Sequence, residues 1–372
     1  MKWILALIVL SLLGAVAWFF LFRGGKDSQA TGTLPASVLT GTAASVPPPP
    51  PPLPELTMAT FRLTPLPLSL PAKLQAQANS GCTSAILIDW TTKELLWAKN
   101  PDTAVPIASM TKMMTTQLLM EAIHKEKRVD MQTRVQVTRA CSKIGGSQVW
   151  LDPRESFTVE ELTKCVMVKS ANDAAYLLGE FLANGDYAAF VARMNQRAAE
   201  LGCTGMKFYN SHGLPPDPKS PENQATPREL AMLAARLVEY PDLMQICGIK
   251  LDALQRPATN PGKPTEIFNH NTLISKRPCA GVDGMKTGLT NKSGHCITAT
   301  CLRNGRRLIA VVCGGHTAID RDRLTAALLD WGYAQQAARQ TAAAAAPARI
   351  PVAATPAKVP AAVPASPPIR SR

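Results

Sequence analysis

A serine and a lysine one helical turn apart are the first candidates for chemistry in this chain of 372 residues. The motif Ser109-x-x-Lys112 lies between Pro106 and an apolar run with helical character, so Ser109 is expected near a helix N-terminus. Residues at i and i+3 share one helix face, which places the amine beside the hydroxyl. Serine is a weak nucleophile that needs a base, and lysine is that base only when burial or a neighbouring cation keeps it neutral. Backbone N–H groups at the helix start would stabilise a developing oxyanion.

Two further motifs carry groups that would complete such a site. Ser170-Ala171-Asn172 supplies a hydroxyl to relay a proton and an amide to orient the substrate and the lysine, although Ser and Asn are also common helix caps. Lys286-Thr287-Gly288 supplies a positive charge, a donor for a carboxylate, and a glycine that lets an extended peptide approach an edge strand. Its alternative interpretation is a basic turn before a strand. Ser-x-x-Lys alone is expected about once by chance in such a chain, so the specificity comes from all three motifs in this order.

Strands are predicted at both ends of the region that holds these motifs. Apolar runs at 84–89 and 93–99 are typical of a strand pair. The dipeptide Asn304-Gly305 predicts a two-residue hairpin turn between strands at 295–303 and 306–313. A sheet built from both ends of one domain would therefore position the motifs.

Helices are predicted between and after these strands. Two capping boxes, Thr158–Glu161 and Thr226–Glu229, mark helix starts, and the segments 172–183 and 186–201 have helical period. A last helix is expected over 321–333. The order of strands, helices, strands and a final helix indicates the α/β class.

The three motifs together resemble those of penicillin-binding proteins and class A β-lactamases. Residues 72–333 resemble the low-molecular-mass penicillin-binding proteins that are serine-type D-alanyl-D-alanine carboxypeptidases. The resemblance extends to Gly145-Gly146-Ser147, Lys169–Ala175, Asn210–Leu214, Val282–Gly288 and Gly314–Arg321. It implies a β-lactamase/transpeptidase-like α/β fold: an antiparallel sheet flanked by helices, plus an all-helical subdomain.

The resemblance implies a catalytic role for four residues of the first two motifs. Ser109 would be the acylated nucleophile and Lys112 its general base. Ser170 and Asn172 would line the cleft, with Ser170 passing a proton towards the leaving amine. The backbone N–H groups of Ser109 and Leu289 would form the oxyanion hole.

The resemblance also implies the substrate-binding residues, which are Lys286, Thr287, Gly288, Leu289 and Arg321. Lys286 would help to keep the lysine base neutral, while Thr287 and Arg321 would bind the terminal carboxylate of the substrate. We expect His212 to be a structural turn residue, and the role of His270 is left open.

The implied activity is removal of the terminal D-Ala from peptidoglycan pentapeptide stems through an acyl-enzyme on Ser109, with β-lactams as covalent inhibitors. Two alternatives stay open: a D,D-endopeptidase of peptidoglycan cross-links, and a penicillin-binding sensor that is acylated without turnover. A class A β-lactamase needs a glutamate in an E-x-x-L-N context, and Glu180–Asn184 has the wrong spacing. No metal or other cofactor is expected, since the five histidines are dispersed.

The ends of the chain differ in composition from the region between them. Residues 1–26 contain an uncharged run of 20 residues, which predicts a single membrane anchor or, alternatively, a cleaved signal segment, with the catalytic domain in the bacterial cell envelope. Residues 27–71 are Pro-rich and read as a linker, and residues 334–372 read as a disordered, Ala/Pro-rich basic tail. Of the net charge of +13, this tail holds +5, and without a nucleic-acid-binding motif no nucleic-acid partner is expected.

The nine cysteines include one testable pair. If Asn304-Gly305 is a two-residue turn, Cys296 faces Cys313 across the hairpin as a closely spaced pair. The register predicts that these two are spatial neighbours and allows a disulfide, provided that no bulge intervenes.

Overall fold

A six-stranded sheet forms the centre of the structure, a computed structural model that describes residues 55–345. The strands in spatial order are β1 (Thr64–Pro65), β3 (Glu94–Lys99), β2 (Ser84–Asp89), β12 (Arg306–Gly315), β11 (Gly294–Arg303) and β10 (Val282–Thr290). All neighbours are antiparallel except the two-residue β1, which pairs parallel to β3. The prediction of a sheet built from both ends of the domain is confirmed.

The predicted hairpin joins β11 and β12 of this sheet. Arg303 pairs with Arg306, and Asn304 and Gly305 both have positive φ, as a type I′ turn requires. The predicted register continues to Ile297, opposite Val312, and then shifts by one residue.

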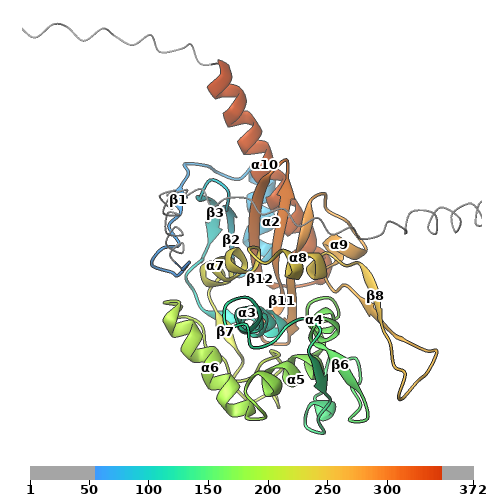
Figure 1. Ribbon diagram of the computed structural model, residues 1–372. Coiled ribbons are helices and arrows are strands. Elements are labelled where there is room, and N and C mark those ends of the chain that lie inside the picture. The colour runs from blue at the N-terminus through green and yellow to red at the C-terminus, as the bar shows by residue number, and fades with distance from the viewer. Residues whose placement is uncertain (1–54, 346–372) are drawn as a thin grey trace, which may run out of the picture. The chain divides into compact units, whose positions relative to one another are not determined.

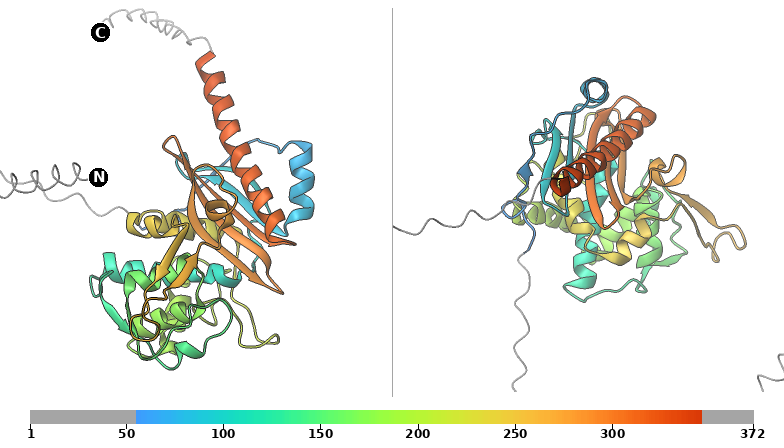
Figure 2. Two further views of the ribbon diagram at one scale, coloured as in Figure 1. Left: turned by 90° about the vertical axis from the view of Figure 1, so that its right-hand side faces the viewer. Right: turned by 90° about the horizontal axis from the view of Figure 1, so that it is seen from above.

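Helices cover both faces of the sheet (Figures 1 and 2). One face carries α2 (Ala72–Gly81) and α10 (Ala318–Ala345). Successive strand side chains point to opposite faces, so Leu87 packs with these two helices while Ile86 and Ile88 pack with the helical region on the other face.

That helical region contains α3 (Lys112–His124), α4 (Val159–Met167), α5 (Asn172–Leu182), α6 (Tyr187–Glu200), α7 (Pro227–Leu237) and α8 (Pro241–Cys247). The capping boxes predicted at Thr158–Glu161 and Thr226–Glu229 are both present and begin α4 and α7. The short elements are β4 (Val105–Pro106) with β7 (Gln224–Ala225), β5 (Arg134–Gln136) with β6 (Ser156–Thr158), β8 (Leu251–Leu254) with β9 (Thr265–Phe268), α9 (Thr272–Ser275), and the 3-10 turns Ala108–Thr111 and Cys141–Lys143.

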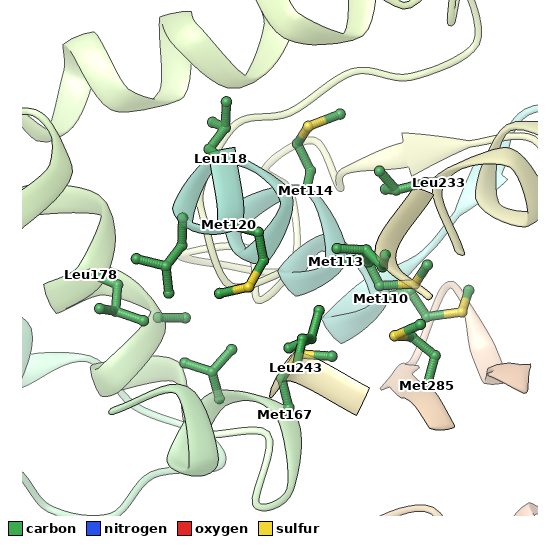
Figure 3. Packing of buried hydrophobic residues seen from close by; sticks show 14 of the residues in the cluster. Met110, Met113, Met114, Leu118, Met120, Met167, Leu178, Leu233, Leu243 and Met285 are labelled. Atoms are coloured by element: carbon green, nitrogen blue, oxygen red, sulfur yellow. The ribbon is translucent and has the colours of Figure 1, made fainter. Parts of the chain in front are cut away.

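The helix α3 lies at the centre of the helical region. Every residue from Lys112 to Ile123 is buried, which leaves only His124 at its C-terminus partly exposed. Figure 3 shows methionines of this helix packing against side chains from neighbouring helices and from β10. Because one solid core surrounds α3, its N-terminal turn is held in a fixed place.

The domain begins earlier than residue 72. Phe61 and Leu70 are buried, and Thr64 pairs with Glu94 of β3, so 55–71 belong to the folded domain and not to the predicted linker. Two buried apolar side chains and a short strand hold the segment, although its proline content is typical of a spacer.

The domain also ends later than predicted, because α10 runs on to Ala345. Its last contacts with the sheet are those of Gln336, which bonds to Asp89, and Arg339, which bonds to Glu94 at 2.7 and 3.0 Å. Alanine has the highest helix propensity, so an Ala-rich sequence after such contacts continues a helix. The predicted tail is therefore wrong for 334–345. Residues 346–372 lie outside the described part, as does the whole predicted anchor.

The nine cysteines, all within the described residues, are free thiols. Cys296 and Cys313 are neighbours, as the hairpin register predicts: Cys296 interacts with Cys313, and its sulfur accepts from Gly314 N at 3.5 Å. The register shift beside Cys296 is the bulge that the prediction named as its exception, and the structure shows no disulfide here.

A buried ion network joins the start of the domain to the helical region. Glu121 of α3 pairs with Arg197 at 2.6 Å and with Arg236 at 2.8 Å, and all three are buried. Glu55 also pairs with both arginines and, at 2.7 Å, with Lys125. These contacts fix residue 55 against α3, α6 and α7.

Glu121→Gln is expected to lower the free energy of unfolding by about 3 kcal/mol, because it leaves two buried guanidinium groups short of one negative charge. Glu126→Gln is the matched control: its carboxylate is half exposed and pairs only with Arg128, so a loss below about 1 kcal/mol is expected. Urea unfolding of both variants measures the difference, and equal losses would contradict a stabilising role for the network.

Candidate active site

Ser109 lies in the 3-10 turn Ala108–Thr111 that leads directly into α3. Lys112 Nζ donates to Ser109 Oγ at 3.1 Å, so the predicted juxtaposition of hydroxyl and amine is present. The turn is tight: Ala108 has φ +46°, a conformation that costs energy for a residue with a Cβ. The surrounding structure therefore holds the nucleophile in place.

Lys112 is held by two further acceptors. Nζ donates to Asn172 Oδ1 at 2.7 Å and to the carbonyl oxygen of His212 at 2.6 Å. Its three donors are thus aimed at three oxygens, one of them the Ser109 hydroxyl. Neutralising the amine frees a lone pair in this same geometry, which is what a general base needs.

The electrostatic surroundings of Lys112 favour the neutral amine. The side chain is fully buried, and burial followed by the positive charge of Lys286 lowers its pKa well below the usual value. Asp173 acts in the opposite direction. The carboxylate of Asp173 accepts bonds from the N–H groups of Val149 and Leu151 and is itself buried, and this burial raises its pKa.

The loop between the 3-10 turn Cys141–Lys143 and β6 positions Asn172. Its Nδ2 donates to Gly145 O at 2.8 Å and its N–H donates to Ser147 O at 2.7 Å. A Cβ on Gly146, which has φ +81°, would lie 2.7 Å from Nδ2 of Asn172, so only glycine fits there. Ser170, two residues before Asn172, is buried at the cleft wall with φ +63°.

Strand β10 forms the opposite wall of the cleft. Lys286 is 1% exposed, and its Nζ donates to Thr287 O at 3.0 Å. Burial, with Arg321 also lowering and Cys247 raising it, brings the pKa of Lys286 to about 7. A Cβ at Gly288 would come within 2.6 Å of Ile107 O and 3.2 Å of Ser109 N, so this glycine allows the strand to pass close to the nucleophile.

Arg321 lies near the start of α10 and is 3% exposed. Asp322 accepts from Arg321 Nε at 2.9 Å and from Nη2 at 2.6 Å, and Cys296 O accepts from Nη1 at 3.2 Å. These bonds fix a cation in the lining of the cleft, which Thr287 also lines.

The predicted site residues come together around one cleft with a volume of about 690 Å³. Those that line it are Ser109, Ser170, Asn172, Thr287, Gly288, Leu289 and Arg321. Lys112 and Lys286 lie behind this lining, fully buried.

Two contributions to the site have no signal in the three motifs. One is the main chain of His212, whose carbonyl accepts from Lys112, while its ring Nδ1 accepts from Leu214 N at 3.2 Å within a turn. Burial, followed by the charge of Lys112, lowers the pKa of His212 to about 3, so the ring is neutral. The other is Gly213, where a Cβ would overlap Ala108 O. In the sequence, only the family resemblance of the Asn210–Leu214 segment points to these two contributions.

Comparison with known proteins agrees with this geometry. The family model described as D-alanyl-D-alanine carboxypeptidase matches residues 72–317. The D-alanyl-D-alanine carboxypeptidase DacF of Bacillus subtilis is 35% identical over 252 residues, which cover 68% of this chain and 62% of that protein. The D-alanyl-D-alanine endopeptidase of Escherichia coli is 26% identical and is covered over 83% of its length.

Solved structures give the same fold. Penicillin-binding protein D2 of Listeria monocytogenes, crystallised in its ampicillin-bound form, has a TM-score of 0.58 and 26% identity, with 68% of this chain and 98% of that chain covered. Penicillin-binding protein 6B of Escherichia coli has a TM-score of 0.62 and 28% identity, with 73% and 81% covered. The predicted β-lactamase/transpeptidase-like fold class is confirmed.

The chain spans a little over three fifths of the length of curated carboxypeptidases that it matches. The match nevertheless covers the whole predicted catalytic region up to residue 317 and contains all three motifs. The chain therefore belongs to the D-alanyl-D-alanine carboxypeptidase family of serine peptidases.

Proposed function

We propose that this chain is a serine-type D-alanyl-D-alanine carboxypeptidase that removes the terminal D-Ala from peptidoglycan pentapeptide stems. The observation that carries the proposal is the 3.1 Å contact between Ser109 Oγ and a fully buried Lys112, in a cleft that also presents Thr287 and Arg321. A nucleophile with its base, beside donors for a carboxylate, fits a peptide that is cut one residue from its C-terminus.

In the acylation step, neutral Lys112 takes the proton of Ser109 as Oγ attacks the carbonyl between the two D-alanines. The N–H groups of Ser109 and Leu289 would receive the oxyanion. Ser170 would pass a proton to the leaving nitrogen, the C–N bond breaks, and free D-Ala departs. The acyl group remains on Ser109 as an ester.

In the deacylation step, water attacks this ester and regenerates Ser109. Lys112, neutral again once its proton has left with D-Ala, is the base nearest to the ester oxygen. No aspartate or glutamate of the described residues lines the cleft. Glu180, the nearest match to a β-lactamase glutamate, accepts from Thr138 Oγ1 at 2.6 Å instead and is absent from the cleft lining. A β-lactam acyl-enzyme should therefore persist.

The substrate carboxylate would bind between Thr287 and Arg321. A bidentate or charge-assisted bond to a guanidinium group is among the stronger interactions available to a carboxylate. Gly288 and Leu289 would lie along the substrate backbone on the edge of β10. Lys286 stays behind this wall and acts through its charge on Lys112.

We also propose that the catalytic domain works in the cell envelope, attached by residues 1–26. The support is the uncharged run of 20 residues in the sequence, which lies outside the described residues. Within residues 55–345 no helix is long and apolar enough to cross a membrane.

Incubation of the purified chain with a pentapeptide ending in D-Ala-D-Ala tests the activity, with mass spectrometry as the readout. Loss of one D-Ala is expected. Cleavage only of cross-linked muropeptide dimers would favour the endopeptidase, which one relative's name supports. Stable labelling by penicillin without any peptide cleavage would favour the sensor.

The positive charge of Lys286 predicts a shift in the pH dependence of acylation when this residue is replaced. Because burial and the Lys286 charge both lower the pKa of Lys112, removing that charge raises it. Lys286→Gln is therefore expected to move the rising limb of the acylation rate with pH to higher pH. The pH dependence of penicillin acylation measures this, with the exposed Lys219→Gln as the control, and a limb that stays in place would contradict it.

A further inference from the structure

The walls of the cleft carry more positive charge than one carboxylate needs. Lys169, Lys276 and Arg321 line it together with His270 and His295, and no acidic residue of the described part does so. Arg321 is committed to the terminal carboxylate in the mechanism above. Two lysines therefore remain without a role in the proposed reaction.

These two lysines have no carboxylate partner within residues 55–345. By contrast, Lys164 pairs with Glu160 at 2.9 Å, and Arg277, next to Lys276, reaches Asp322 at 4.0 Å. Burial, followed by the charges of Lys286, Lys169, Lys112 and Lys276, lowers the pKa of His270 to about 4, so its ring is neutral. The side chains that lower this pKa are all lysines, and among the described residues the cleft lining holds no acidic residue to balance Lys169 and Lys276.

Lys169 lies on the leaving-group half of the cleft. It directly precedes Ser170, the residue proposed to protonate the leaving nitrogen. The facing wall meets it there, because the His270 N–H donates to Val168 O at 3.0 Å.

Lys276 also lines the cleft, and its helix is linked to Arg321. It follows α9, which begins at Thr272, and Thr272 Oγ1 bonds to the carboxylate of Asp322. The same carboxylate holds Arg321. The two lysines and Arg321 thus line one cleft together with Ser170, the proposed donor to the leaving nitrogen.

We propose that Lys169 and Lys276 form a second anion subsite that favours leaving groups with a further carboxylate beyond the terminal one. This inference rests on the proposed function. An acidic peptide chain is a leaving group of this kind, whereas free D-Ala carries one carboxylate only. Cross-linked stem peptides present such an acidic leaving strand, so the subsite would add the cutting of cross-links to the trimming of single stems at the same nucleophile.

Three acyl-D-Ala-D-Xaa peptides with the same acyl part test this subsite, with D-Xaa as D-Ala, D-Glu or D-Gln. D-Glu and D-Gln have the same shape and differ by one charge. The kcat/KM ratio of D-Glu over D-Gln should be roughly three- to ten-fold in the wild type, the size of two partly exposed ion pairs. In the double variant that carries Lys169→Met and Lys276→Met, the ratio should fall towards one. In the wild type, the ratio should decline as the salt concentration rises.

Lys263→Met is the matched control, since it removes an equal charge from the loop between β8 and β9, outside the cleft lining. It should leave the ratio at the wild-type value. A wild-type ratio near one, with D-Ala-D-Ala still cleaved, would overturn the subsite alone. If none of the three peptides is cleaved, the proposed function is overturned instead.

Discussion

Lys112→Met is expected to lower the rate of acylation by penicillin about a thousand-fold, the usual contribution of a positioned general base. The reason is the contact between Lys112 Nζ and Ser109 Oγ at 3.1 Å, which methionine cannot replace. Methionine fills a similar volume and adds no charge to a fully buried position, so the loss should come from chemistry more than from packing. Stopped-flow or gel-based labelling with a fluorescent penicillin gives the rate.

Lys125→Met is the control for this experiment. Lys125 follows the last turn of the same helix and is half exposed, so its variant makes the same side-chain replacement without touching the nucleophile. Melting curves of both variants separate slow acylation from unfolding. A folded Lys112→Met that is acylated within about ten-fold of the wild-type rate would remove Lys112 from the role of base.

Gly213→Ala is expected to cost at least about 3 kcal/mol of stability and to slow acylation about a hundred-fold or more. A Cβ at this position would lie 1.9 Å from Ala108 O and 2.8 Å from Ser109 N, both of them backbone atoms. The turn that carries the nucleophile would have to move, since neither atom belongs to a flexible side chain. Urea unfolding and penicillin labelling measure the two effects.

Gly262→Ala separates the clash from the backbone conformation. Gly262 has φ +77°, close to the +89° of Gly213, but a Cβ there would meet nothing within 4 Å. It should therefore cost only about 1 kcal/mol and leave acylation unchanged. Similar losses in both variants would mean that positive φ alone, not contact with the nucleophile turn, explains the effect at Gly213.

The sequence could predict the parts of the site that depend on local spacing. Ser109 and Lys112 are one helical turn apart, so their contact follows once α3 forms. Asn304-Gly305 determines the hairpin because both positions need positive φ. The interpretation of Ser170-Ala171-Asn172 as part of the same site then predicts the meeting of Asn172 with Lys112, 60 residues away.

The parts that could not be predicted depend on main-chain groups and on sparse contacts. The His212 carbonyl accepts from Lys112, yet a carbonyl leaves no mark in the residue type. The segment from residue 55 has the composition of a spacer, but Phe61, Leu70 and the ion pairs of Glu55 fold it onto the domain. The helix beyond residue 333 continues because Gln336 and Arg339 bond to the sheet.

Peptide mass mapping after penicillin labelling tests the central claim most directly. The wild-type chain should carry one penicilloyl adduct, on the proteolytic fragment that contains Ser109, and Ser109→Ala should carry none while it melts like the wild type. An adduct on another residue, or equal labelling of the folded Ser109→Ala variant, would contradict the assignment of Ser109 as the acylated nucleophile.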